Sequence, residues 1–369
     1  MTTPPLPRLA PIPASLPDSV PFVGPETLER RRGAPFRARL GANENGFGPS
    51  PAAVAAMRDA AAQAWKYGDP TSHDLREGLA KKHGVAPGSI LVGEGIDGLL
   101  GLTARLFVGP GDMVVTSAGG YPTFDFHVTG FGGVLDRVPY RDGRQDAAGL
   151  VDRAAQAGAR LVYLCNPDNP MGGFLEPAEI EAAVARLPGD GVLALDEAYG
   201  EFAPALPRID PDDPRIIRFR TFSKAYGLAG ARVGYAIAAP GVIRGFDRVR
   251  NHFGVNSVGQ AGALAALSDD AWLSGMLAQV ADARARIAQI ARDNGLSPLP
   301  SATNFVAIDC GQGGDFARAV LAALAERGVF VRMPWVAPQD RCIRVSCGPE
   351  AGLDAFAEAL PQALAAARG

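Results

Sequence analysis

The stretch TFSKAYGLAGAR, residues 221–232, places a lysine just after an apolar run and an arginine eight residues further on. Residues 216–222 read as a buried strand, so Lys224 is expected at a strand end beside Ser223, with Arg232 close to the next strand. A protonated amine is a poor nucleophile, and burial or neighbouring positive charge lowers its pKa and makes it reactive. The pattern indicates a nucleophilic amine beside an anion site, although an ordinary surface lysine fits the same residues.

Lysine usage sharpens this interpretation. Among 36 basic residues only four are lysines, at positions 66, 81, 82 and 224. The first three are predicted on polar helical stretches, so Lys224 is the one lysine expected at the end of a strand.

Outward from this stretch, short apolar runs alternate with helical patterns. Strands are predicted at residues 90–92, 113–116, 134–140, 161–165, 192–195, 216–222 and 234–238, with helices between most of them, such as 177–186. Such alternation predicts an α/β fold with a mostly parallel sheet covered on both faces.

The pattern of predicted helices and strands changes near residue 240. Helices are predicted at 257–268, at 270–293 and from Glu350 onward, and short strands at 305–309, 329–332 and 343–347. We therefore expect a large domain over residues 41–240, a smaller α+β domain over 241–369, and an N-terminal arm over 1–40 that joins the small domain.

Residues 93–98, GEGIDG, match the G-x-G-x-x-G form of a dinucleotide site between a strand and a helix. Glu94 and Asp97 place carboxylates where a pyrophosphate needs bare amides, and nearly a quarter of the chain precedes the motif. A single phosphate at the helix N-terminus is the favoured interpretation, with a dinucleotide or a plain tight turn as alternatives.

Two further motifs follow predicted strands. CNPDNPMG, residues 165–172, forms a rigid extended loop or simply a turn, at the sheet edge where α/β proteins bind ligands. LALDEAY, residues 193–199, ends in Asp196, which can bind Mg²⁺, face a protonated ring nitrogen, or be an ordinary charged strand end. No G-x-x-x-x-G-K-[ST] phosphate loop accompanies it.

Bulk properties exclude several classes of protein. A net charge of −3 gives no basic field for nucleic acid, and no apolar run reaches the roughly 20 residues that a membrane helix needs. The Pro-rich N-terminus lacks the apolar core of a signal peptide and reads as an extended arm, so a cytoplasmic protein is expected. Four scattered cysteines and four histidines predict neither a disulfide framework nor a metal site.

The chain resembles the fold-type I, class I/II aminotransferases, and most closely the histidinol-phosphate aminotransferase family. The resemblance rests on three motifs in this order: N-P-x-N-P-x-G, D-E-A-Y and S-K-A-x-x-L-A-G-x-R. The resemblance runs from about residue 40 to the C-terminus. It implies an aspartate-aminotransferase-like fold, a pyridoxal 5'-phosphate cofactor, and transfer of an amino group to 2-oxoglutarate by a ping-pong mechanism.

The resemblance also implies residue roles around the cofactor ring. Lys224 would hold the cofactor covalently and move the α-proton, and Asp196 would pair with the pyridinium nitrogen. Asn169 and Tyr199 would bind the phenolic oxygen, and Tyr121 would stack on the ring.

Two anion sites are implied as well. The residues matching the family's cofactor-phosphate site are Ile96, Asp97, Ser223 and Arg232, together with Tyr67, which would reach the neighbouring subunit's site and so implies a homodimer. The residues matching its substrate pocket are Asn43, the carboxylate-reading Arg344, the phosphate-binding Arg332, and Phe22, which stands where the family has a tyrosine.

The missing hydroxyl at Phe22 weakens the case for a phosphate substrate and makes an aromatic amino acid such as phenylalanine the rival donor. A pyridoxal-phosphate-dependent decarboxylase acting on an amino-acid phosphate is an alternative reaction on the same fold. An NAD-linked dehydrogenase built on residues 93–98 and a non-catalytic ligand sensor are the further alternatives.

Overall fold

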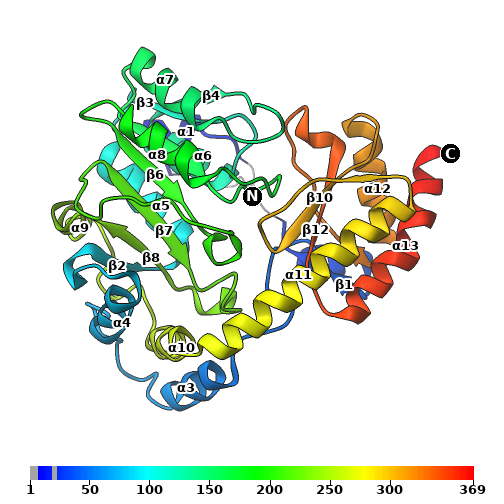
Figure 1. Cartoon of the computed structure of the whole chain (residues 1–369), viewed down its shortest axis with the longest axis horizontal. Helices are drawn as coiled ribbons and strands as arrows, with labels where there is room; N and C mark the ends of the chain where they lie inside the picture. The colour runs from blue at the N-terminus through cyan, green and yellow to red at the C-terminus, as the bar shows by residue number, and fades with distance from the viewer. Residues whose placement is uncertain (1–6, 19–22) are drawn as a thin grey trace, which may run out of the picture.

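The computed structural model describes residues 7–18 and 23–369, and its centre is a seven-stranded sheet of order β2-β8-β7-β6-β5-β3-β4 (Figure 1). The strands are β2 (Ile90–Gly93), β3 (Met113–Ser117), β4 (Val134–Val138), β5 (Leu161–Cys165), β6 (Val192–Asp196), β7 (Ile216–Thr221) and β8 (Gly234–Ala238). All seven predicted strands are confirmed, with ends shifted by at most two residues.

The direction of the strands sets the position of the site. β4, β3, β5, β6 and β7 run parallel to one another, whereas β8 runs antiparallel to both of its neighbours, β7 and β2. The predicted mostly parallel sheet is confirmed. The carboxyl ends of β5, β6 and β7 consequently meet at one edge, where β8 begins.

Helices cover both faces of this sheet because alternate residues of its buried strands point to opposite sides. Val162 and Leu164 of β5 join one apolar cluster with α7 (Ala147–Ala157) and α8 (Pro177–Ala185). Leu161 and Tyr163 join a larger cluster on the other face. The helices that contribute to it include α4 (His73–His83), α5 (Gly95–Phe107), α6 (Pro122–Gly130), α9 (Pro240–Phe246) and α10 (Ser257–Leu267).

A smaller unit lies beside the large sheet and is drawn mostly in orange and red in Figure 1, with its β1 in blue and its α11 in yellow. Its antiparallel sheet has the order β12-β10-β9, and β1 pairs in parallel with β11. The strands are β1 (Ala38–Arg39), β9 (Ser297–Pro298), β10 (Phe305–Asp309), β11 (Val329–Phe330) and β12 (Cys342–Ser346), and the helices are α11 (Asp270–Asp293), α12 (Gly314–Glu326) and α13 (Glu350–Arg368). The helices and short strands predicted after residue 240 are thus present in the structure.

Packing suggests a different boundary between the two units. α10 contacts α3 (Pro51–Ala61) and α4, and α9 contacts α5 and β2, so both helices lie with the large sheet rather than with the small one. The yellow α11 runs from α10 to the small sheet in Figure 1. We therefore propose a boundary within α11 in place of residue 240, because the local sequence pattern does not say which surface an Ala-rich helix will cover.

The N-terminal region contains two helices, α1 (Pro11–Ser15) and α2 (Pro25–Arg32). The reading of the whole terminus as an extended arm was therefore wrong over α1, which starts with a proline at its first turn and packs Ile12 against Gly132. Lys66 likewise lies in the turn after α3 and not on a helix. No helix in residues 7–18 or 23–369 is long and apolar enough to cross a bilayer.

Candidate active site

A cavity of about 480 Å³ opens at the edge where the parallel strands end, and it collects nearly all of the residues expected in the site. Its walls include Asn43, Ile96, Asp97, Tyr121, Asn169, Asp196, Tyr199, Ser223, Lys224, Arg232, Arg332 and Arg344. These residues come from segments up to 300 positions apart. The fold therefore brings the separate sequence motifs to one place.

Lys224 is held inside this cavity, just after β7. Its Nζ donates a hydrogen bond of 3.1 Å to the carbonyl oxygen of Asn43 and lies 5.8 Å from the ring centre of Tyr199. Burial, helped by the guanidinium of Arg344, lowers the pKa of Lys224 to about 8. A substantial fraction of the amine is therefore neutral and nucleophilic near neutral pH.

Asp196 ends β6 and presents a buried carboxylate to the same cavity. One oxygen accepts from the hydroxyl of Tyr163 at 2.7 Å, and the other accepts from the backbone N–H of Ala198 at 2.9 Å. Burial raises the pKa of Asp196 to about 6 despite these two donors. The carboxylate is therefore largely ionised at neutral pH and can pair with a cation in the cavity.

Polar side chains from both units meet above Lys224. Asn43 Nδ2 donates to the Tyr199 hydroxyl at 3.0 Å, and Arg344 donates to the side-chain oxygen of Asn169. A second guanidinium N–H of Arg344 donates to the carbonyl oxygen of Gly41 at 3.2 Å. These contacts hold the side chains of Asn169 and Tyr199 in the wall of the same cavity.

The other end of the cavity is a ready anion site. Gly95 begins α5 with a φ of +76°, and a side chain there would come within 2.6 Å of the guanidinium of Arg232. The free N–H groups at this helix start, near Ile96 and Asp97, therefore lie beside a cation and the Ser223 hydroxyl group. The arrangement suits one phosphate.

Arg332 and Arg344 lie on neighbouring backbone segments in the small unit. Arg332 N–H donates to the Arg344 carbonyl at 3.2 Å, and Arg344 N–H donates back at 2.6 Å, so the two residues form a paired bridge. Arg332 also donates from its side chain to the Val23 carbonyl at 2.8 Å. Burial lowers the pKa of Arg344 to about 10, which leaves the guanidinium charged at neutral pH.

Among the expected residues that the structure describes, Tyr67 does not line this cavity. The Tyr67 ring is 81% exposed and packs at 4.9 Å against Phe253, which is itself half exposed. Phe22 lies outside the residues that the structure describes. Gly24 and Pro25, shortly after it, line the cavity.

The sequence motifs missed several residues of the site. Residues 333–336 form part of the cavity wall, and Trp335 in this loop is 66% exposed. The loop is tied to the large unit where Gln339 Nε2 donates to the Ala118 carbonyl at 3.1 Å and where Val336 packs on Gly119. An exposed tryptophan between proline residues was the available signal in the sequence.

Glu44 and Tyr163 were also missed. Glu44 lines the cavity, and its charge raises the pKa of Lys224 against the effect of burial. Tyr163 lies on the same face of β5 as Cys165, which pairs with Asp196 in the parallel register. That neighbour relation depends on the register between strands, which the sequence pattern alone does not give.

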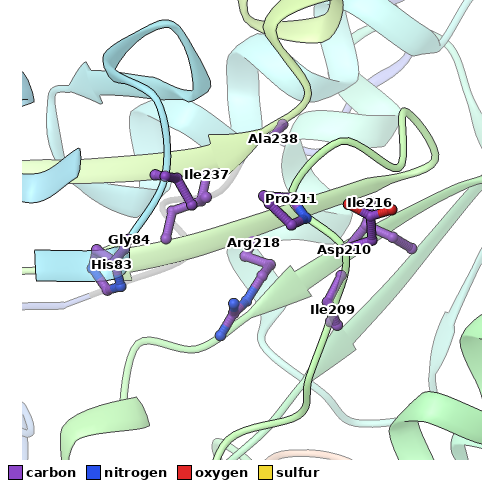
Figure 2. A pocket seen from close by; sticks show the side chains of 10 residues that line it. His83, Gly84, Ile209, Asp210, Pro211, Ile216, Arg218, Ile237 and Ala238 are labelled. Carbon is purple, nitrogen blue, oxygen red and sulfur yellow. The ribbon is translucent and has the colours of Figure 1, made fainter. Parts of the chain in front are cut away.

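A second, smaller hollow of about 150 Å³ lies at the opposite edge of the sheet, where β7 begins and β8 ends (Figure 2). Figure 2 shows Arg218 between His83 and the turn that carries Asp210. Arg218 donates to both carboxylate oxygens of buried Glu197, at 3.1 and 3.0 Å, and His83 Nε2 lies 2.8 Å from the Tyr235 hydroxyl. Arg218 and His83, which line this hollow, are therefore each bound to a neighbouring buried side chain outside it.

The geometry of the large cavity, a desolvated lysine with an opposed carboxylate and two anion sites, defines a pyridoxal-phosphate-dependent transaminase. A family model described as aminotransferase class I and II matches residues 38–360, and the chain belongs to this family.

Known relatives agree with this assignment. A histidinol-phosphate aminotransferase from Moorella thermoacetica is 33% identical over 92% of this chain and 89% of the relative. A solved structure of histidinol-phosphate aminotransferase from Sinorhizobium meliloti, in complex with pyridoxal-5'-phosphate, is 51% identical and superposes with a TM-score of 0.95 over 98% of this chain and 99% of the other. An aspartate aminotransferase variant from Thermus thermophilus, 24% identical over 96% of this chain and all of the other, shares the fold with a TM-score of 0.77. The predicted aspartate-aminotransferase-like fold is therefore confirmed.

Proposed function

We propose that the protein transfers an amino group from histidinol phosphate to 2-oxoglutarate by a ping-pong mechanism. The observation that carries this proposal is the paired bridge of Arg332 and Arg344, which brings two guanidinium groups into the cavity that holds Lys224. One donor carries a phosphate and no carboxylate, whereas the acceptor carries two carboxylates. Guanidinium forks bind either anion through two parallel hydrogen bonds, so one pocket can serve both substrates.

The residues in the cavity fit pyridoxal phosphate, which when bound supplies the electron sink for bond breaking at the amino-acid α-carbon. Asp196 would face the ring nitrogen, while Asn169 and Tyr199 would bind the phenolic oxygen. Tyr121 lines the same cavity and would cover the ring. The start of α5 together with Ser223 and Arg232 would bind the phosphate.

Lys224 would act twice in this cavity. Its neutral amine first binds the cofactor, since burial holds the pKa at about 8. With an amino-donor substrate in the cavity, Lys224 Nζ would accept the α-proton as a base and would later donate a proton as an acid to complete the transfer. General acid–base work of this kind accelerates a reaction by roughly 10²–10⁴-fold.

We further propose that the protein acts as a cytoplasmic homodimer. Trp65 and Tyr67 are each 81% exposed, and Phe253 beside Tyr67 is 53% exposed. Exposed aromatic groups of this size favour a protein partner, because contiguous apolar surface is disfavoured on a monomer. In the dimer Tyr67 would reach the phosphate site of the neighbouring subunit.

The test is a panel of half-reactions. Enzyme loaded with pyridoxal phosphate is mixed with histidinol phosphate, phenylalanine or glutamate, and the loss of the cofactor's visible absorbance band is followed in time. Histidinol phosphate should give the largest kcat/KM among the donors. Release of CO₂ without use of 2-oxoglutarate would instead indicate a decarboxylase, and faster reaction with phenylalanine would indicate an aromatic aminotransferase.

Phe22→Tyr tests the phosphate pocket itself. A restored hydroxyl donor to a charged group contributes about 1.5–3 kcal/mol, or roughly tenfold to hundredfold in kcat/KM. We expect the gain for histidinol phosphate alone, and we expect Arg332→Ala to lower turnover of that donor. An equal effect on phenylalanine, or an unchanged rate in Arg332→Ala, would place the phosphate elsewhere.

A further inference from the structure

Two tyrosine–aspartate pairs can be compared, of which Tyr163–Asp196 is buried whereas Tyr140–Asp168 has a partly exposed tyrosine. Tyr163 donates to Asp196 at 2.7 Å, and Tyr140 donates to Asp168 at 2.9 Å. Burial raises the pKa of each carboxyl group to about 6. The two pairs differ in position, because the cavity is lined by Asp196 and not by Asp168.

The Tyr163 hydroxyl is fixed in place by its surroundings. Its ring is stacked on Phe124, with ring centres 4.3 Å apart and planes inclined by 13°, and the whole side chain is only 1% exposed. Within residues 7–18 and 23–369, Tyr163 is the one side chain that donates a hydrogen bond to Asp196. Water cannot replace a donor at this depth, so the bond is specific to this residue.

The charges around Asp196 would not by themselves keep it ionised. Glu197 follows it on β6 and raises its pKa, while Lys224 lowers it. Cys165 pairs with Asp196 on the neighbouring strand β5, and Tyr121 lines the same cavity. A hydrogen bond donated to the anion is the remaining stabilising contact from a side chain, and hydrogen bonds to charged groups are about twice as strong as neutral ones.

We propose that Tyr163 is a positioning residue that keeps the Asp196 carboxylate anionic, so that the proton shared with the cofactor's ring nitrogen stays on the ring. The inference rests on the cofactor placement proposed above. Because the Tyr163 hydroxyl stabilises the anion and not the protonated acid, its removal moves the shared proton towards Asp196 Oδ.

The test uses Tyr163→Phe, which retains the ring stack and removes one oxygen, with Tyr140→Phe as the matched control at the second pair. Both variants are loaded with pyridoxal phosphate labelled with ¹⁵N in its ring, and the ring-nitrogen chemical shift is compared with that of the wild type. In Tyr163→Phe the shift should move towards that of an unprotonated pyridine, and the donor half-reaction should slow by about tenfold. In Tyr140→Phe the shift should stay at the wild-type value.

The outcomes separate the two proposals. If the wild type does not bind pyridoxal phosphate at Lys224, the proposed cofactor placement fails. If it binds and Tyr163→Phe keeps the wild-type shift, or Tyr140→Phe moves it equally, the role of Tyr163 is wrong. Should Tyr163→Phe not fold, the wild type still decides, because an unprotonated ring nitrogen in the loaded wild type contradicts a Tyr163 role in keeping it protonated.

Discussion

The floor and the mouth of the cavity are built in different ways. In the floor, Asp196 ends β6 and Lys224 follows the neighbouring strand β7; Asp196 is buried and Lys224 is partly buried. The mouth combines residues 24–25 of the N-terminal region with the loop 333–336 of the small unit, where Trp335 is 66% exposed. We expect the floor to determine the reaction and the mouth to contact the part of the donor that does not react.

Substitutions in the floor should reduce turnover more than substitutions in the mouth. The largest loss is expected for Lys224→Ala. The variant should bind pyridoxal phosphate without a covalent link and lose turnover by several orders of magnitude, since general acid–base catalysis alone contributes roughly 10²–10⁴-fold. Borohydride reduction of the wild type, followed by peptide mass analysis, should place the cofactor on the Lys224 peptide. Lys82→Ala, at a surface lysine paired with Asp270, should keep full activity. A label on any other lysine would contradict the assignment.

The lowered pKa of Lys224 in the floor predicts how the rate of cofactor attachment depends on pH. The pKa of Lys224 is lowered to about 8, so its amine is protonated below that pH and neutral above it. Covalent attachment of pyridoxal phosphate to the cofactor-free protein should therefore slow by about tenfold for each pH unit below 8 and level off above it. Stopped-flow absorbance measurements between about pH 6 and pH 10 give the profile. A rate that still rises beyond pH 10 would show an amine of ordinary pKa.

Arg344 belongs to the small unit and links separate segments of the cavity wall. Its side chain donates hydrogen bonds to Asn169 and to the carbonyl oxygen of Gly41. Lysine cannot reproduce a planar fork with two parallel donors, so Arg344→Lys should raise KM for 2-oxoglutarate by about tenfold to hundredfold. Arg341→Lys is the matched control, because Arg341 pairs with Asp309 and its side chain is 55% exposed. Equal effects in the two variants would mean that Arg344 does not read the carboxylate.

The smallest effect is expected at the mouth. Trp335→Ala should lower kcat/KM for donors with a planar ring by about twofold to tenfold, the range typical of one aromatic contact. The half-reaction with 2-oxoglutarate, which has no ring, serves as the control within the same variant and should be unchanged. If both half-reactions slow alike, Trp335 supports the loop and does not contact the donor.

The same contrast explains what could be predicted from the sequence. Lys224, Asp196 and Asn169 were expected in one site because their motifs, in this order and spacing, resemble those of the class I/II aminotransferases; each motif also follows an apolar run that predicts a strand. Tyr163 was missed because its contact with Asp196 depends on the register between β5 and β6. The packing of α9 and α10 could not be inferred from the sequence, because it depends on tertiary contacts and not on helical periodicity.

The loop that carries Trp335 is anchored at both ends. It begins at the paired bridge between Arg332 and Arg344 and ends where Gln339 donates to Ala118. Segments with fixed ends can be exchanged for others of the same length with little disturbance of the surrounding fold. Residues 333–338 are thus a natural cassette for engineering: new sequences grafted between the two anchors should retune the choice of amino donor while the strand ends continue to carry out the same reaction.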